Sequence, residues 1–204
     1  MADLHEFLNQ LSSADPVPGG GSVAALQTAM AAALVAMVAN LTLGRKKYEE
    51  VQDQAASILT RAMALRDRAL ALVDEDIEAY RAVSAAFALP RTSDEERDER
   101  QRRLQNALKG AVKPPLETMR AASDVASLAA ELVGIGNKSA ISDVGTAVLA
   151  ARAGYHAALL NVEINLALIR DEAWREEIRR KLALIPATDT IESSVLSQVR
   201  NTIG

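Results

Sequence analysis

Two long segments in which alanine fills many positions constrain what this chain can fold into more than any other feature. The first, Val23–Ala39, has only Gln27 and Thr28 as polar residues, and the second runs from Ser142 to about Ile169. Large apolar residues recur every three or four positions in the first segment, which is the period of an α-helix. Because aromatic residues make up only 3% of the chain, the core must consist of small aliphatic side chains. These features predict an all-α fold, an antiparallel helical bundle with long alanine-rich central helices.

The segment Val23–Ala39 approaches the length of a membrane-spanning helix. Alanine contributes little to membrane insertion, and no belt of aromatic residues flanks the segment. We therefore expect a buried central helix and no membrane partner. The N-terminal residues Met1–Leu11 lack a basic region followed by an apolar stretch, so they do not resemble a signal peptide. The expected location is the cytoplasm.

Proline, glycine and capping residues divide the rest of the chain into helices. The expected helices run over Asp3–Leu11, from Ser22, over about Lys46–Leu89, from Ser93, and from Ser142 to about Ile169, followed by two short amphipathic helices. The expected breaks or kinks are Pro16–Gly21, Gly44, Pro90, Pro114–Pro115 and Gly134–Lys138. Ser93 and Glu96 have the spacing of a capping box.

Length and composition exclude several classes of protein. The 204 residues fit a single domain, 1–204, and 49% hydrophobic with 25% charged residues is typical of a globular chain. The absence of cysteine excludes disulfides, thiolate metal sites and cysteine nucleophiles. A net charge of -4 leaves no basic footprint for nucleic acid. His5 and His156 have no partner at metal-ligand spacing, so we expect no metal site.

Three consecutive glycines, Gly19, Gly20 and Gly21, lead directly into Ser22 and the first alanine-rich helix. The N–H groups of a first helical turn attract anions, and glycine allows a ligand to approach the backbone. A flexible cap is the alternative interpretation. The run matches neither a phosphate loop nor a dinucleotide fingerprint, so a nucleotide is not implied.

Four carboxylates gather within residues 74–78, in the middle of the expected long helix. Asp76 follows Val73 by three residues and precedes Tyr80 by four, which places it beside the packed face of that helix. A carboxylate that faces a cavity suits a cationic or proton-transferring substrate. An ion pair with a lysine or arginine of a neighbouring helix explains the carboxylates equally well.

A polar loop precedes the second alanine-rich helix. Asn137, Lys138, Ser142 and Asp143 bring an amide, a cation, a hydroxyl and a carboxylate together within seven residues. Ser142 or Asp143 acting as a helix N-cap is the simplest explanation. The density of polar groups also indicates a binding site.

Two further sets of polar residues need partners from the protein or from a ligand. The amides on the apolar helices are Asn40, Asn161 and Asn165. Arg45 and Lys46 begin a basic cluster at a helix start, where positive charge opposes the helix dipole. An anionic ligand or a surface salt bridge would explain that placement.

In their order and spacing, three blocks of sequence resemble the formiminotransferase-cyclodeaminase C-terminal family, which includes stand-alone methenyltetrahydrofolate cyclohydrolases. The blocks are Pro18–Ala25 with Met37–Thr42, Asp74–Tyr80 with Phe87–Pro90, and Gly136–Gly145 with Asn161–Leu166. The likeness spans about residues 3–170. It implies a helical homodimer that binds folate in a cleft lined by these blocks, with the tetrahydrofolate derivative as substrate and no other cofactor.

The resemblance also implies chemistry at the bridging one-carbon unit of tetrahydrofolate. Hydrolysis of a methenyl bridge needs a directed water, a base and a negative charge near the cationic carbon. Asp76 and Asp143 are the candidates for these roles. Tyr80 and the asparagines are candidates for binding the substrate, and Lys138, the Arg45 cluster and the glycine run suit the anionic glutamate tail.

Since no transferase domain precedes the helical part, we expect hydrolysis of 5,10-methenyltetrahydrofolate to 10-formyltetrahydrofolate. The alternatives are formiminotetrahydrofolate cyclodeaminase, which closes the same ring with release of ammonia, and a non-catalytic helical assembly protein.

Overall fold

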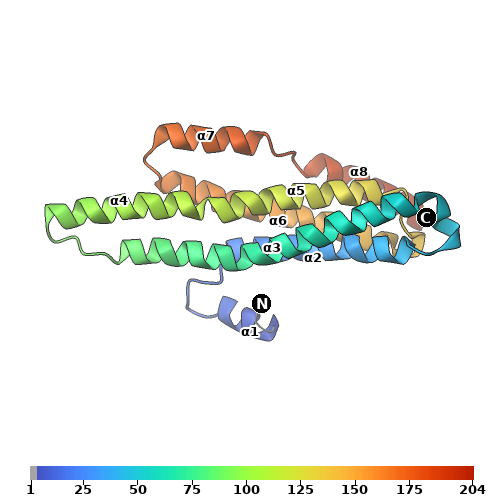
Figure 1. Ribbon diagram of the computed structural model, residues 1–204, viewed down its shortest axis with the longest axis horizontal. Helices are drawn as coiled ribbons and strands as arrows, with labels where there is room; N and C mark the ends of the chain where they lie inside the picture. Colours follow the sequence, from blue (N-terminus) through green and yellow to red (C-terminus); the bar gives the residue numbers. More distant parts are fainter. Residues whose placement is uncertain (1–3) are drawn as a thin grey trace.

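The computed structural model describes residues 4–204, which form an elongated bundle of long helices (Figure 1). The elements are α1 (Leu4–Leu11), α2 (Gly20–Thr42), η1 (Lys46–Val51), α3 (Gln52–Phe87), α4 (Asp94–Ala111), α5 (Lys113–Val133), η2 (Lys138–Ala140), α6 (Ile141–Leu168), α7 (Glu172–Ala183) and α8 (Asp189–Ile203). No strand occurs within these residues, so the predicted all-α class is confirmed. Asp3, the expected start of the first helix, lies outside the described residues.

The centre of the bundle consists of α2, α3, α5 and α6, and α2 contacts the other three. The two alanine-rich helices α2 and α6 run antiparallel, because Gly20 lies beside Asn161 while Thr42 at the other end of α2 accepts a hydrogen bond from Asn137. Buried alanine and valine residues fill the space between the helices. Small side chains therefore set how closely the central helices approach.

The helices α2 and α6 approach each other closely at Gly154. A Cβ atom there would lie 2.5 Å from Thr28 Oγ1 and 3.0 Å from the Ala24 carbonyl oxygen. The Thr28 hydroxyl is itself fixed, since it donates to that carbonyl at 2.9 Å. Glycine at 154 is thus a requirement of helix packing.

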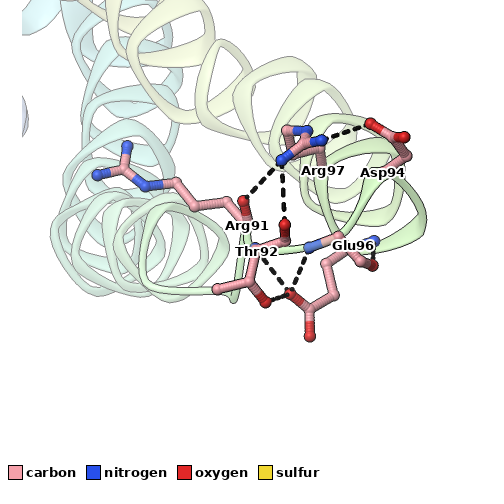
Figure 2. Close-up of polar contacts among 6 residues, drawn as sticks. Arg91, Thr92, Asp94, Glu96 and Arg97 are labelled. Carbon is pink, nitrogen blue, oxygen red and sulfur yellow. Dashed lines mark hydrogen bonds and ion pairs between the residues drawn. The ribbon is translucent and has the colours of Figure 1, made fainter.

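Two expected caps are wrong. The N-cap of α2 is Gly19 and makes no side-chain hydrogen bond, while Ser22 lies inside the helix and donates to Asp76 instead. At α6 the N-cap is Ala140, so neither Ser142 nor Asp143 caps that helix. The capping box of α4 is confirmed, with Ser93 accepting from the Glu96 N–H and the Glu96 carboxylate accepting from the Ser93 N–H. Figure 2 shows the Glu96 carboxylate turned back onto this turn.

The expected long helix over Lys46–Leu89 is divided into η1 and α3 at Val51, which has non-helical backbone angles, and Tyr48 interrupts η1 in the same way. Gln52 stabilises the turn between α2 and α3: its amide oxygen accepts from Gly44 N–H at 2.8 Å, and its amide nitrogen donates to the Tyr48 carbonyl at 2.7 Å. Gly44 has a φ of 69°, the left-handed conformation that glycine adopts without strain. The predicted break at Pro114–Pro115 is confirmed, since α5 begins there.

Among the described residues, α2 is the one helix long and apolar enough to cross a membrane by length and composition. In the structure, 61% of its most apolar window is buried inside the protein. Its apolar character is accounted for largely by contacts with α3, α5 and α6.

We predict that Gly154→Ala destabilises the protein by about 1–3 kcal/mol, because the added methyl group overlaps the fixed Thr28 hydroxyl and a backbone carbonyl. The matched control is Gly110→Ala in α4, where a Cβ atom would meet nothing within 4 Å. That change should leave stability unchanged or raise it by about 0.5–1 kcal/mol, since alanine is the better helix former. Urea unfolding of both variants measures the difference, and equal stabilities would contradict the packing argument.

Candidate active site

A cavity of about 470 Å³, the site pocket, opens where the start of α2 meets α3, α4 and α6. Its polar lining contains most of the residues that the sequence indicated from the glycine run, the acidic cluster and the end of α6. These are Gly19, Gly20, Gly21, Asp76, Tyr80, Asn161 and Asn165. The structure thus brings three separate sequence blocks to one pocket.

Asp76 is the carboxylate of the site pocket. Ser22 Oγ, which is fully buried, donates a hydrogen bond to Asp76 Oδ2 at 2.9 Å. Burial raises the pKa of Asp76 above its usual range, and the hydrogen bond from Ser22 only partly opposes that shift. The neighbouring acids differ, because Glu75 pairs with Arg68 and Glu78 pairs with Arg81. Glu75 and Glu78 therefore form ion pairs within α3 itself and not with a neighbouring helix as the alternative interpretation expected, whereas the partner of Asp76 is a hydroxyl.

The glycine run allows the start of α2 to approach Asp76. A Cβ atom on Gly21 would overlap the Asp76 carboxylate, so any larger residue would displace that side chain. At Gly20 a Cβ atom would lie 3.4 Å from Asn161 Nδ2, the short end of ordinary contact. The position that requires glycine most is therefore Gly21.

Two amides face the pocket from α6. Asn161 Nδ2 donates to the Ala157 carbonyl at 2.8 Å. Asn165 Nδ2 donates to the carbonyls of Asn161 at 2.9 Å and Ala111 at 3.2 Å. Because both N–H bonds of Asn165 are directed at the protein backbone, its amide oxygen is the group that can accept from a ligand.

The apolar side of the pocket is formed by Val17, Ala79, Val83, Phe87, Leu108, Ala111, Ile164 and Leu168. None of them was named as a candidate site residue, although Ala79, Phe87 and Ile164 lie in blocks that the resemblance placed along the cleft. On α3, Asp76, Tyr80, Val83 and Phe87 follow one another at helical spacing, so they line one face. That spacing was the available signal, but it does not distinguish a pocket wall from a packed face.

The remaining predicted site residues lie at the opposite end of the bundle. They are Asn40, Arg45, Lys46, Asn137, Lys138, Ser142 and Asp143. Asn137 joins the loop to the end of α2, since its Nδ2 donates to the Leu41 carbonyl at 2.9 Å. Asp143 precedes Asn161 by 18 residues in the same helix, a separation of about 27 Å. Within a single chain, part of each block therefore lines the site pocket, while Met37–Thr42 of the first block and Gly136–Gly145 of the third do not.

Known proteins resemble this chain over nearly its whole length. The formiminotransferase-cyclodeaminase family model matches residues 3–184. The chain belongs to this family. It is 39% identical over 202 residues to a methenyltetrahydrofolate cyclohydrolase of Methylorubrum extorquens, an alignment that covers 98% of this chain and 97% of that protein.

Other relatives are named as cyclodeaminases. The chain is 34% identical to a formimidoyltransferase-cyclodeaminase of Rattus norvegicus, covering 89% of this chain but 34% of the rat protein. The crystal structure of a formiminotetrahydrofolate cyclodeaminase from Thermotoga maritima matches with a TM-score of 0.82 at 32% identity, covering 98% of this chain and 94% of that one. The helical bundle is thus the fold of this family.

We predict that Ser22→Ala raises the pKa of Asp76 further, because it removes a hydrogen bond that favours the charged carboxylate. The proton would then remain on Asp76 to a higher pH than in the unmodified protein. An NMR titration of carbon-labelled aspartate measures this shift. Ser123→Ala is the control, since the Ser123 hydroxyl donates to the Pro186 carbonyl and not to an acid. An unchanged or lower Asp76 pKa in Ser22→Ala would contradict the assignment.

Proposed function

We propose that the protein hydrolyses 5,10-methenyltetrahydrofolate to 10-formyltetrahydrofolate in the site pocket. The observation that carries this proposal is Asp76, a part-buried carboxylate held by Ser22 over a glycine backbone and beside two amides. The methenyl carbon is cationic, and a carboxylate in a partly dry pocket stabilises positive charge strongly. The Methylorubrum extorquens relative, similar over its full length, bears the name of this activity.

The reaction has two steps that a single carboxylate can serve. Water adds to the methenyl carbon as ionised Asp76 accepts one of its protons, which gives a neutral tetrahedral adduct. The bond from that carbon to N5 then breaks as Asp76 returns its proton to N5. The hydroxyl of the adduct gives up its own proton to Asp76 and then to solvent and becomes the formyl oxygen on N10, so one proton is released overall. A base with a raised pKa is better matched to this transfer near neutral pH than an ordinary aspartate. Turnover should therefore rise as pH increases through the Asp76 pKa.

The same pocket suits a second reaction, the cyclodeaminase reaction, which closes the methenyl bridge with release of ammonia. There N10 attacks the carbon of the formimino group on N5, and the amino group of the resulting adduct leaves as ammonia after it is protonated, so the protonated form of Asp76 would be the donor. The rat and Thermotoga maritima relatives bear names of this activity. In both reactions the substrate carries the one-carbon unit itself, so we propose that no further cofactor takes part. We place the reaction in the cytoplasm.

The assay of the purified protein follows loss of the methenyl chromophore, with ammonia release from the formimino substrate measured in parallel. We predict that Asp76→Asn lowers turnover by about 10²–10⁴-fold, the usual contribution of a general base. The stability of the fold should be retained, because the substitution removes a part-buried charge. Folding is checked by circular dichroism. Near-normal turnover in Asp76→Asn would remove Asp76 from the mechanism, and absence of both activities in the unmodified protein would overturn the proposed function.

A matched pair of glycine substitutions tests the same carboxylate without altering any charge. Gly21→Ala should displace the Asp76 side chain and reduce turnover, because the new methyl group overlaps it. Gly20→Ala on the preceding residue meets Asn161 only at 3.4 Å and should retain most activity. Equal turnover in the two variants would mean that activity does not depend on the position of the Asp76 side chain.

We further propose that the protein is a homodimer formed through the outward face of α2 and α6. The large apolar residues exposed on these helices and outside the site pocket are Met30, Met37 and Leu41 on α2, and Leu149 and Leu160 on α6. The two helices are adjacent, and exposed apolar residues gathered on neighbouring helices indicate an interface. A second copy of the chain presents the same face, as two-fold symmetry requires.

A two-fold axis across this face would reunite the separated site residues. Ser142 lies on the same side of α6 as Leu149 and Leu160, and Asn40 lies on the same side of α2 as Met37. An axis perpendicular to the helices reverses their direction and places the Asn40 and Asp143 end of one copy against the Gly20 and Asn161 end of the other. Asp143 of the second copy would then complete the site.

Mixing two inactive variants tests this arrangement. If Asp76 and Asp143 act across the dimer, a heterodimer of Asp76→Asn with Asp143→Asn contains one unmodified site and one doubly modified site. We predict that a mixture re-equilibrated at equal amounts recovers up to about a quarter of normal turnover, since half of the dimers are mixed. No recovery, with mixed dimers confirmed by mass spectrometry, would mean that the two residues do not share a site.

Leu160→Glu should yield monomers in analytical ultracentrifugation, whereas Leu184→Glu, also at an exposed leucine, should not.

A further inference from the structure

A second cavity, of about 310 Å³, is lined mainly by arginine, and we refer to it as the arginine pocket. Its lining residues are Arg91, Arg97, Asp98, Arg100, Gln101 and Arg170. They come from the turn between α3 and α4, from the first part of α4, and from the segment after α6. Four arginines and one aspartate thus line one cavity in a chain whose net charge is -4. The local excess of positive charge is opposite to the overall charge of the chain.

Two of these arginines are fixed by the protein. Arg97 Nη1 donates to the Arg91 carbonyl at 3.2 Å, and Arg97 also pairs with Asp94 (Figure 2). Arg100 Nε donates to the Phe87 carbonyl at 3.2 Å, and its guanidinium lies 5.6 Å from the centroid of the Phe87 ring. These contacts hold one wall of the pocket in place.

The other two arginines are available to a ligand. Within residues 4–204, the guanidinium groups of Arg91 and Arg170 form no ion pair with an acidic side chain. In Figure 2 the Arg91 side chain extends away from the hydrogen-bonded group around Glu96. The backbone of Arg170 is anchored, since its N–H donates to Gln105 Oε1 at 2.7 Å. Two uncompensated cations on anchored backbone are suited to binding an anion.

The arginine pocket adjoins the site pocket at the end farthest from Asp76. Phe87 lines the site pocket and is also the residue that Arg100 contacts. On the opposite wall, Gln105 Nε2 donates to the Leu168 carbonyl at 3.0 Å, and Gln105 also holds Arg170. Asp76 and Phe87 are 11 residues apart on α3, which separates the two ends of the site pocket by about 16 Å.

We propose that the arginine pocket binds the carboxylates of the γ-linked glutamate tail of the tetrahydrofolate substrate, an inference that rests on the proposed function. A tetrahydrofolate is an extended molecule with its pterin and one-carbon bridge toward one end and its carboxylates at the other. With the bridge at Asp76, the aromatic p-aminobenzoyl spacer lies along the apolar wall that ends at Phe87 and Leu168. The tail then reaches Arg91 and Arg170, whose planar guanidinium groups match carboxylates bidentately.

A competing location for the tail is the basic loop region around Lys46 and Lys138 at the other end of the bundle. The sequence indicated this region, together with the glycine run, for the anionic tail. Lys46 and Lys138 line a separate cavity there. Asp76 lies beside the start of α2, whereas that cavity lies past the end of α2 in the same chain. The proposed dimer would bring the same cavity of the second copy closer to Asp76. The two locations therefore need to be separated by substitution.

Calorimetric titration with pteroylmonoglutamate and pteroyltriglutamate measures tail binding independently of turnover. We predict that the unmodified protein binds the triglutamate more tightly, and that the double variant Arg91→Gln, Arg170→Gln weakens triglutamate binding by about tenfold or more and removes most of that preference. Turnover of the monoglutamate substrate at saturation should stay near normal, because neither arginine reaches the one-carbon unit. Arg102→Gln is the matched control, since Arg102 lies on the same helix, pairs with Glu99 and does not line the pocket.

The outcomes separate this inference from the proposed function. Normal turnover with unchanged triglutamate affinity in the double variant would overturn the inference and leave the proposed function standing. Loss of the preference in a Lys46→Gln, Lys138→Gln variant instead would place the tail at the basic loop. Tight, arginine-dependent triglutamate binding without turnover of either substrate would support the tail site and overturn the proposed function.

Discussion

The close antiparallel packing of α2 and α6 is the constraint on which the rest of the structure depends. Gly154 allows the two helices to approach until a Cβ atom would meet Thr28 and the Ala24 carbonyl, and the surrounding alanines add little bulk. This packing fixes the register that places Gly20 beside Asn161. The polar wall of the site pocket is therefore a direct result of how the alanine-rich helices pack.

The electrostatics of the site follow from the same geometry. Asp76 points from α3 toward the start of α2, where the absence of a side chain at Gly21 leaves room for its carboxylate. Ser22, the next residue, supplies the hydrogen bond that partly offsets the burial. A carboxylate in this position keeps a raised pKa while remaining hydrogen-bonded, which suits proton transfer near neutral pH. Its acidic neighbours Glu75 and Glu78 point to arginines and have ordinary surface roles.

The site pocket and the arginine pocket meet at Phe87, which lines the first and contacts Arg100 of the second. From Asp76 onward the protein presents a negative charge, an apolar wall and then positive charges. The proposed substrate presents groups of the opposite charge in the same order, namely a cationic carbon, an aromatic spacer and anionic carboxylates. The complementarity extends over the whole length of the ligand. It gives a role to Arg91 in the turn between α3 and α4 and to Arg170 after α6, whose guanidinium groups form no ion pair within the described residues.

The sequence by itself determined the helical class, most of the helix ends and the position of Asp76 beside a packed face of its helix. Those features depend on local patterns, namely helical periodicity, the conformational limits of proline and glycine, and a carboxylate at the spacing of a packed face. Only the tertiary structure decided that Ser22 binds Asp76 rather than capping α2, that the Asn137–Asp143 loop lies at the opposite end from the site pocket, and that Phe87 and Leu168 line a pocket rather than a core. These outcomes depend on which helix ends meet in space, and residues distant in sequence acquire common surroundings only through that packing.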